Sequence, residues 1–130
     1  MAYSILRHEH LTTVSLSDEI TGNDLIDAYL DLTNDPQHGP HLNVVWDCRH
    51  ISSIVVDWPQ LISLRALIMD RCSDKAGPGR FAIIASRDVV YLTGIMVCRL
   101  TRKKPKPKKV FRSLDDASTW LNISNLSRYL

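Results

Sequence analysis

Cysteine is scarce in this chain, and its pattern excludes the roles that clustered cysteines usually have. Cys48, Cys72 and Cys98 are odd in number, lie far apart and form no C-x-x-C pair. This spacing excludes a disulfide framework and a zinc ribbon. Long apolar runs are missing too, since nothing approaches the roughly 20 apolar residues of a membrane-spanning helix. The first residues show no secretory signal. We therefore expect free thiols and a cytoplasmic protein.

Motifs that bind cofactors are also missing. No glycine-rich phosphate loop follows a predicted strand, so the usual nucleotide fingerprint is excluded. His8 and His10 have no third metal ligand spaced near them. We therefore expect no metal and no other cofactor.

One cluster of polar residues could be catalytic. Asp47, Cys48, Arg49 and His50 follow a predicted strand, where open α/β sheets usually bind ligands. A thiol beside an imidazole could act as a nucleophile, but no third group is identifiable to orient the pair. Asp47 and Arg49 are expected to form a structural ion pair. We therefore predict that the protein is not an enzyme.

The spacing of apolar and capping residues predicts nine regular elements. The predicted strands cover residues 4–7, 11–16, 42–47, 81–85 and 109–111. The predicted helices begin at Thr21, Asp57, Asp88 and Ser113 and end near residues 34, 72, 100 and 121. The order β-β-α-β-α-β-α-β-α favours an α/β fold, with a mixed β-sheet of about five strands and four helices. We expect one domain over residues 1–121 and a C-terminal tail over residues 122–130.

Three segments carry a family resemblance. They are Val44–Arg49 (VVWDCR), Arg80–Ala85 (RFAIIA) with Asp88, and Val110–Ala117 (VFRSLDDA) with Trp120 and Leu121. In this order they resemble the STAS fold of anti-sigma-factor antagonists and, more closely, small bacterial proteins of STAS/SEC14-like type. The resemblance covers most of residues 1–121. It implies an α/β binding module, and the SEC14-like relatives imply a lipid-like ligand.

The resemblance does not extend to the phosphoserine switch of the anti-sigma-factor antagonists. In those proteins a phosphorylatable serine begins the helix after the strand that matches Val44–Arg49. The matching turn here reads Asp57-Trp58-Pro59 and offers no hydroxyl group. We therefore expect no control by phosphorylation at this turn.

The predicted helix 88–100 is apolar on nearly every side. Nine of the twelve residues from Val89 to Leu100 are apolar, whereas a surface helix needs only one apolar stripe. Its outer face must be covered by the tail 123–130, a hydrophobic ligand, a partner subunit or a bilayer. The candidate contacts to an apolar ligand are Tyr91, Leu92, Ile95 and Met96.

A basic segment follows this helix. Seven basic residues and no acidic ones lie between Arg102 and Arg112, and removing them from the net charge of +2 leaves −5 for the rest. An acidic body therefore carries one basic segment, which is either a solvated loop or a contact to an anionic surface. The candidate contacts are Arg102, Lys103, Lys104, Lys106, Lys108 and Lys109. Nucleic acid is a weaker candidate, because Phe111 is the only aromatic residue available for stacking.

Together these features predict a non-enzymatic binding or regulatory module. We expect it to bind an apolar, lipid-like ligand or to associate peripherally with an anionic membrane. The alternative is a protein–protein module that forms a dimer or docks a partner through helix 88–100.

Overall fold

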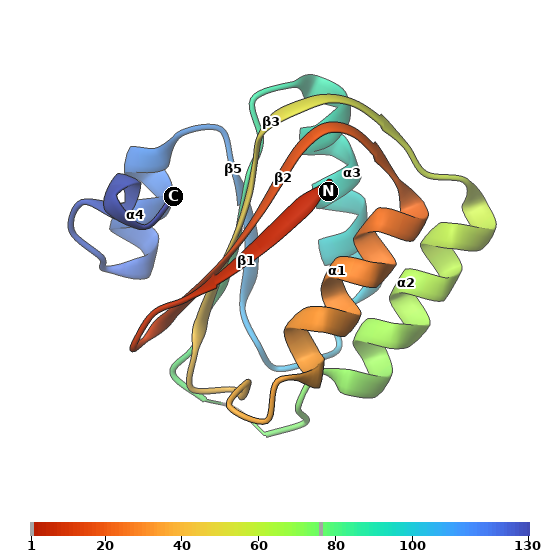
Figure 1. Cartoon of the computed structure of the whole chain (residues 1–130). Coiled ribbons are helices and arrows are strands. Elements are labelled where there is room, and N and C mark those ends of the chain that lie inside the picture. Colours follow the sequence, from red (N-terminus) through yellow and green to blue (C-terminus); the bar gives the residue numbers. More distant parts are fainter. Residues whose placement is uncertain (1, 76) are drawn as a thin grey trace.

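The computed structural model describes residues 2–75 and 77–130. Its centre is a five-stranded sheet with the strand order β1-β2-β3-β4-β5, and helices cover both faces (Figure 1). β1 pairs antiparallel with β2, and the other three pairings are parallel. The mixed sheet of five strands with four α-helices confirms the predicted fold class.

The elements follow the predicted order. The strands are β1 (Tyr3–Arg7), β2 (Leu11–Thr21), β3 (Asn43–Val55), β4 (Phe81–Ile84) and β5 (Lys108–Phe111). The helices are α1 (Gly22–Asn34), α2 (Trp58–Arg71), α3 (Asp88–Leu100), α4 (Leu114–Leu121) and the 3₁₀ helix η1 (Leu126–Tyr129). The side chains of Thr21 and Asp57 accept hydrogen bonds from the backbone three residues later and cap α1 and α2.

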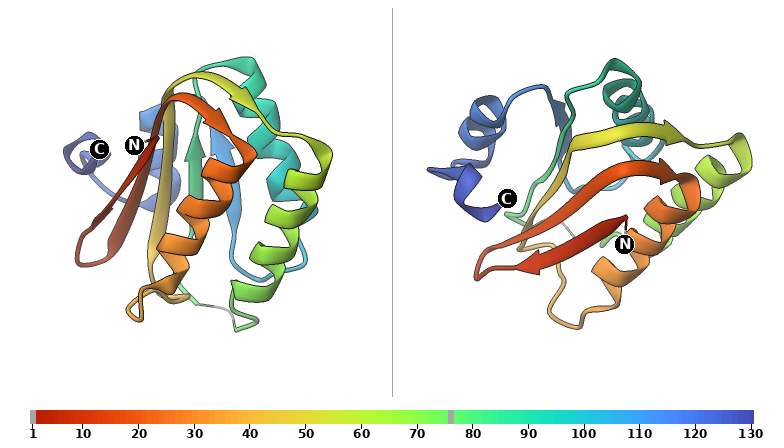
Figure 2. Two further views of the ribbon diagram at one scale, coloured as in Figure 1. Left: turned by 45° about the vertical axis from the view of Figure 1, so that its right-hand side comes forward. Right: turned by 45° about the horizontal axis from the view of Figure 1, so that its top comes forward.

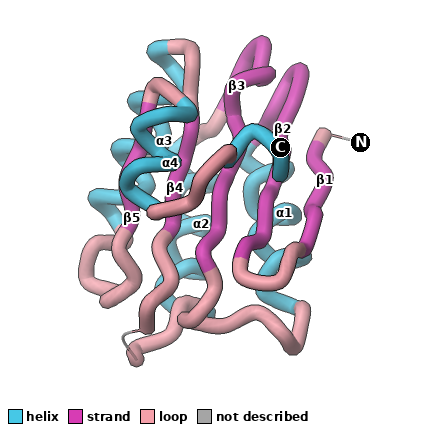
Figure 3. The backbone as a smooth tube through the Cα atoms, turned by 90° about the vertical axis from the view of Figure 1, so that its left-hand side faces the viewer, coloured by secondary structure: helices cyan, strands magenta, loops and turns pink. Residues whose placement is uncertain are grey.

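Each of α1, α2 and α3 connects two neighbouring parallel strands, and all three lie on one face of the sheet (Figures 1 and 2). Between these helices and the sheet lies the main core, which includes Val14, Leu32, Val44 and Ile68. α4 and η1 lie on the opposite face (Figure 3). A second core beneath them includes Val45, Ala82, Ile84 and Leu126.

The C-terminal tail belongs to the second core and not to α3. Leu126 of η1 is only 1% exposed and packs with residues of the α4 face. The Thr13 hydroxyl donates a hydrogen bond to the Tyr129 carbonyl at 3.3 Å, and the His8 and Tyr129 rings meet with centroids 4.9 Å apart. The tail is therefore docked on the face of the sheet opposite to α3, and the outer side of α3 is left uncovered by it.

β3 is much longer than the six-residue strand predicted over 42–47. β2 and β3 extend past the end of β4 as a two-stranded ribbon that bends over toward the helix layer (Figures 1 and 2). Their register shifts twice, between Ser15 and Ser17 and between Asp18 and Glu19. Each shift places an extra residue on β3, and such bulges bend a strand and increase its twist. Asp18 takes the left-handed conformation, with φ 63°, beside the second shift.

Candidate functional site

The longer β3 corrects the expected position of the polar cluster. Cys48, Arg49 and His50 lie within the strand and not in a loop beyond it. Cys48 is buried in the main core, where burial raises the pKa of its thiol to about 12, while His50 is exposed. The two side chains therefore do not form a nucleophile–base pair. Arg49 binds both carboxylate oxygens of the buried Asp47, at 2.8 and 3.0 Å, which confirms the expected ion pair.

The described residues also contain no group of three or more histidine, cysteine or acidic side chains placed to hold a metal ion. Within the same part of the chain, no helix has the length and apolar character to cross a membrane.

The outer side of α3 carries an exposed apolar stripe. Val89, Leu92 and Met96 follow one another at spacings of three and four residues and therefore share one side of the helix. They are 51%, 61% and 47% exposed. We call these three residues the α3 stripe. These three exposed side chains make the outer side of α3 a candidate contact surface.

The four predicted ligand contacts are divided between two sides of α3. Leu92 and Met96 belong to the stripe, whereas Tyr91 and Ile95 are partly buried against the main core. Arg112 bonds to Asp88 at 2.7 Å, and its guanidinium lies over the Tyr91 ring, 4.2 Å from the centroid. These contacts hold the first turn of α3 against the strand β5.

A narrow apolar crevice lies beneath α3. Its α3 wall is formed by Val90, Thr93, Gly94 and Val97, so it contains none of the four predicted contacts. Its volume is about 60 Å³, room for roughly two water-sized groups. In this conformation the crevice does not hold an acyl chain.

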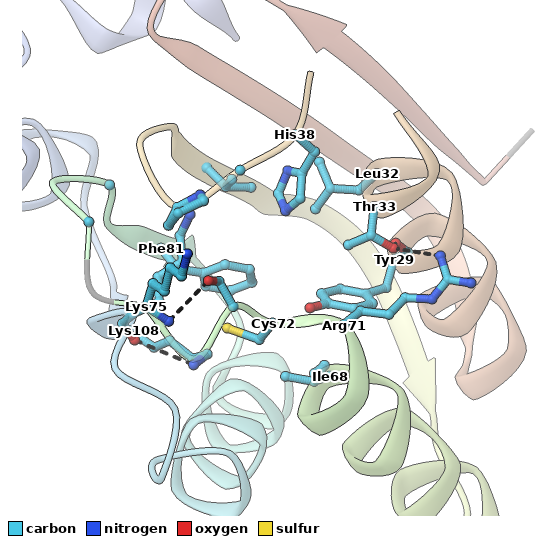
Figure 4. Close-up of a pocket in the computed structure, with 17 residues that line it drawn as sticks. Tyr29, Leu32, Thr33, His38, Ile68, Arg71, Cys72, Lys75, Phe81 and Lys108 are labelled. Carbon is cyan, nitrogen blue, oxygen red and sulfur yellow. Dashed lines mark hydrogen bonds between the residues drawn. The ribbon is translucent and has the colours of Figure 1, made fainter. Parts of the chain in front are cut away.

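The six predicted basic contacts divide into three sets. Arg102, Lys103 and Lys109 are exposed. The ammonium group of Lys104 pairs with Asp74 at 2.6 Å. The remaining two, Lys106 and Lys108, line a pocket, and Lys108 is labelled there in Figure 4. The segment is therefore not one continuous basic surface.

Exposed cations nevertheless lie at both ends of α3. Arg87 precedes the helix, Arg99 lies three residues beyond Met96, and Arg102 and Lys103 follow the last turn. The one acidic residue of α3, Asp88, is neutralised by Arg112. The outer side of α3 thus combines apolar groups with positive charge.

The pocket that receives Lys106 and Lys108 was not predicted. It lies where β3, β4 and β5 begin and where α1 and α2 end, at the edge opposite to the one that open α/β sheets usually use. A sequence signal existed: Lys106, Lys108 and the core residue Val110 alternate at a two-residue spacing. In an extended segment such residues point to the same face of a sheet.

Comparison with known proteins places the fold but not the function. Neither the family models nor the curated proteins give a match. Among solved structures, the chain is similar to an uncharacterised protein of the DUF3478 family from Shewanella loihica PV-4, whose crystal structure has a SpoIIAA-like fold. The TM-score is 0.58 at 17% sequence identity, and the match covers 92% of each chain. This chain therefore has a SpoIIAA-like, and so STAS-like, fold.

Proposed function

We propose that this protein is a non-enzymatic binding module that attaches peripherally to anionic membranes through the outer side of α3. The observation that carries the proposal is the exposed α3 stripe with exposed cations at both ends of the helix. Apolar side chains flanked by arginine and lysine are typical of surfaces that rest in the headgroup region of a bilayer.

The expected affinity is modest. Burying the exposed half of each stripe side chain contributes about 1 kcal/mol. Each cation near an anionic surface contributes about 1 kcal/mol more. Against the cost of immobilising the protein, these terms predict reversible binding that depends on the charge of the lipids.

Charge favours a membrane over a second copy of the chain as the partner. A dimer built on the α3 stripe would bring the cations at the ends of the two helices, Arg87, Arg99, Arg102 and Lys103 of each copy, near one another, and like charges in an interface oppose association. The chain outside the basic segment carries −5, which repels an anionic surface. The membrane would therefore orient the molecule with α3 toward the lipids.

The first test is co-sedimentation with vesicles of phosphatidylserine and phosphatidylcholine. We expect binding at low salt, weaker binding as salt rises because the charges are screened, and little binding to phosphatidylcholine alone. Leu92→Asp should abolish most of the bound fraction. Leu6→Asp is the matched control, because Leu6 is a comparably exposed apolar residue on β1.

A second pair of variants tests the charges. Arg99→Gln should weaken binding several-fold, while Arg128→Gln, which removes an exposed cation from η1 on the opposite face, should not. Binding that ignores salt, or equal losses in both arginine variants, would count against the proposal. Light scattering tests the alternative: a stable dimer that Leu92→Asp dissociates would show that the stripe is a protein interface.

A further inference from the structure

The pocket at the amino-terminal edge of the parallel strands has a one-sided charge. Four cationic side chains line it, those of Arg71, Lys75, Lys106 and Lys108, and no carboxylate does so among the described residues. The acidic residues nearby are engaged elsewhere, since Asp74 pairs with Lys104 and Asp35 pairs with Arg7 at 2.5 Å. The pocket therefore presents positive charge that the described part of the chain does not neutralise.

Lys106 and Lys108 are the most informative of these residues because they are partly buried. Burial lowers the pKa of both ammonium groups. Lys106 donates to the Leu42 carbonyl at 2.8 Å, and Lys108 donates to the Lys106 carbonyl at 3.4 Å. An ammonium group has three donors, so each retains hydrogen-bonding capacity. Withdrawing a cation from water is unfavourable unless an anion or further acceptors compensate it.

Arg71 also carries positive charge into the pocket, but its guanidinium is bound by groups at the end of α1. Arg71 is the last residue of α2. Its guanidinium donates to the Thr33 hydroxyl at 3.1 Å and to the Asn34 side chain at 2.6 Å, and both residues lie at the end of α1. The carbonyl ends of two helices attract such a cation. Lys106 and Lys108, by contrast, bond to carbonyl groups of loop residues, Leu42 and Lys106.

The rest of the pocket is mostly apolar. The rings of Tyr29 and Phe81 and the Cys72 thiol face one space together with the His38 imidazole (Figure 4). Burial, and next the charge of Lys106, lower the pKa of His38 to about 4, so the ring is neutral at pH 7. Its Nδ1 atom is buried and has no hydrogen-bond partner among residues 2–75 and 77–130, and a ligand could supply one.

The size of the pocket limits the ligand. Its volume is about 260 Å³, which admits on the order of ten non-hydrogen atoms. Tyr29, Ile68 and Phe81 line both this pocket and the crevice beneath α3, so the apolar side of the pocket continues toward the core. A whole phospholipid does not fit, whereas a compact acid with an apolar body does.

We infer that this pocket binds a small organic anion, whose carboxylate or phosphate group contacts Lys106 and Lys108 and whose apolar body lies against Tyr29 and Phe81. The site is independent of the α3 stripe, so either proposal can fail alone. Binding of an anion would explain why Lys106 and Lys108 face the pocket, whereas lysines that only solvate a loop would point outward.

The test uses four probes on the full chain in a ligand-observed NMR titration: benzoate, phenyl phosphate, neutral benzamide and inorganic phosphate. We expect benzoate or phenyl phosphate to bind, and whichever binds identifies the head group. Benzamide, which has the same shape as benzoate without the charge, should bind at least about tenfold more weakly, as loss of a charged hydrogen bond predicts. Inorganic phosphate should also be weaker, because it lacks the apolar body.

Alkylation locates the bound probe. Neutral iodoacetamide should modify Cys72 in the free protein, and peptide mass spectrometry should show that the bound anion slows this modification. The double variant Lys106→Met and Lys108→Met should lose at least about tenfold in affinity, as loss of charge-assisted hydrogen bonds predicts. Lys103→Met with Lys109→Met is the matched control, because it removes two exposed lysines from the same segment.

Several results would overturn the inference. They are the absence of binding by both organic anions at millimolar concentration, equal binding of benzamide and benzoate, and equal losses in the two double variants. Inorganic phosphate binding as tightly as phenyl phosphate would remove the apolar part of the proposal. The probe comparison uses the unmodified protein, so it remains decisive even if the Lys106/Lys108 variant fails to fold.

Discussion

Burial favours the neutral form of ionisable groups, so in this fold it raises the pKa of thiols and lowers the pKa of ammonium groups. Cys48 and Cys98 are thiols that burial keeps neutral, since it raises their pKa values to about 12 and about 11. Lys106 and Lys108 remain at a pocket wall, where burial lowers their pKa values but a ligand can still reach them. The same physical effect thus marks Cys48 as a packing residue and the two lysines as candidates for binding.

The buried thiols predict how stability depends on pH. A folded-state pKa above the ordinary value of 9.0 means that the unfolded chain releases its proton first as pH rises. The resulting stability is complete below pH 9 and is lost above it, by about 1.4 kcal/mol per pH unit for each thiol. Urea unfolding between pH 8 and about 10.5 should show this decline. Lys106 and Lys108 reduce it, because their lowered folded-state pKa values add stability as pH rises toward 10.5.

The variant Cys48→Ala isolates one of the two thiols. It should lower the free energy of unfolding at pH 8, because it leaves a small cavity, but its decline above pH 9 should be shallower than that of the unmodified chain. If the free energy of unfolding falls equally steeply with pH in both proteins, the Cys48 thiol ionises as readily in the folded chain as in the unfolded chain.

At the scale of elements, apolar and capping patterns predicted the order of the five strands and four α-helices. They ended β2 at Leu16 and β3 at Asp47, whereas the strands run to Thr21 and Val55, and they missed the 3₁₀ helix η1. The two-residue alternation that indicates a strand is interrupted in β3 by two bulges, so the residues after Asp47 resemble a loop. The ribbon also extends past β4, where polar residues such as His50 and Ser53 face solvent. Bulges depend on the pairing partner, which the local sequence does not specify.

The candidate site was predictable only in part. The excess of apolar residues in α3 indicated that its outer side must be covered by the tail, a ligand, a partner or a bilayer. In the structure the tail packs on the other face of the sheet, and the α3 stripe is exposed. The direction of each lysine was not apparent from composition. It depends on the register of β5 against β4, which pairs Lys108 with Phe81 and so turns it toward the helix layer.

Gly94 gives a test of how closely α3 packs on the sheet. A Cβ atom at this position would lie 3.2 Å from Val110 and 3.5 Å from Ile83, so the helix approaches β4 and β5 closely. Gly94→Leu should lower the free energy of unfolding by about 1–3 kcal/mol through overpacking. Gly94→Ala should change it by less than about 1 kcal/mol, because better helix propensity offsets the tight contact.

Chemical denaturation measures both variants. A Gly94→Leu protein as stable as the unmodified chain would mean that α3 can move away from the sheet without cost. In that case the crevice beneath the helix could also widen to admit a larger ligand.

At the scale of the whole molecule, the two faces of the sheet differ in how completely they are covered. The helix layer carries both candidate binding regions, the α3 stripe and the cationic pocket. The opposite face is closed by α4 and by the tail, whose Leu126 is almost fully buried. This division predicts that damage to the tail affects stability and leaves the binding surfaces intact.

Leu126→Ala tests this division. Removing a fully buried leucine side chain should lower the free energy of unfolding by about 2–5 kcal/mol. Deleting residues 122–130 should cost more, because it exposes the apolar side chains beneath η1, among them Leu11, Val45 and Ile84. Thermal unfolding followed by circular dichroism measures both effects, and vesicle binding below the lowered melting temperature should be unchanged for Leu126→Ala.

If the chain without residues 122–130 melts like the full chain, residues 1–121 are a complete domain and the tail is an accessory. If it unfolds or aggregates, the tail is part of the core, as the burial of Leu126 requires.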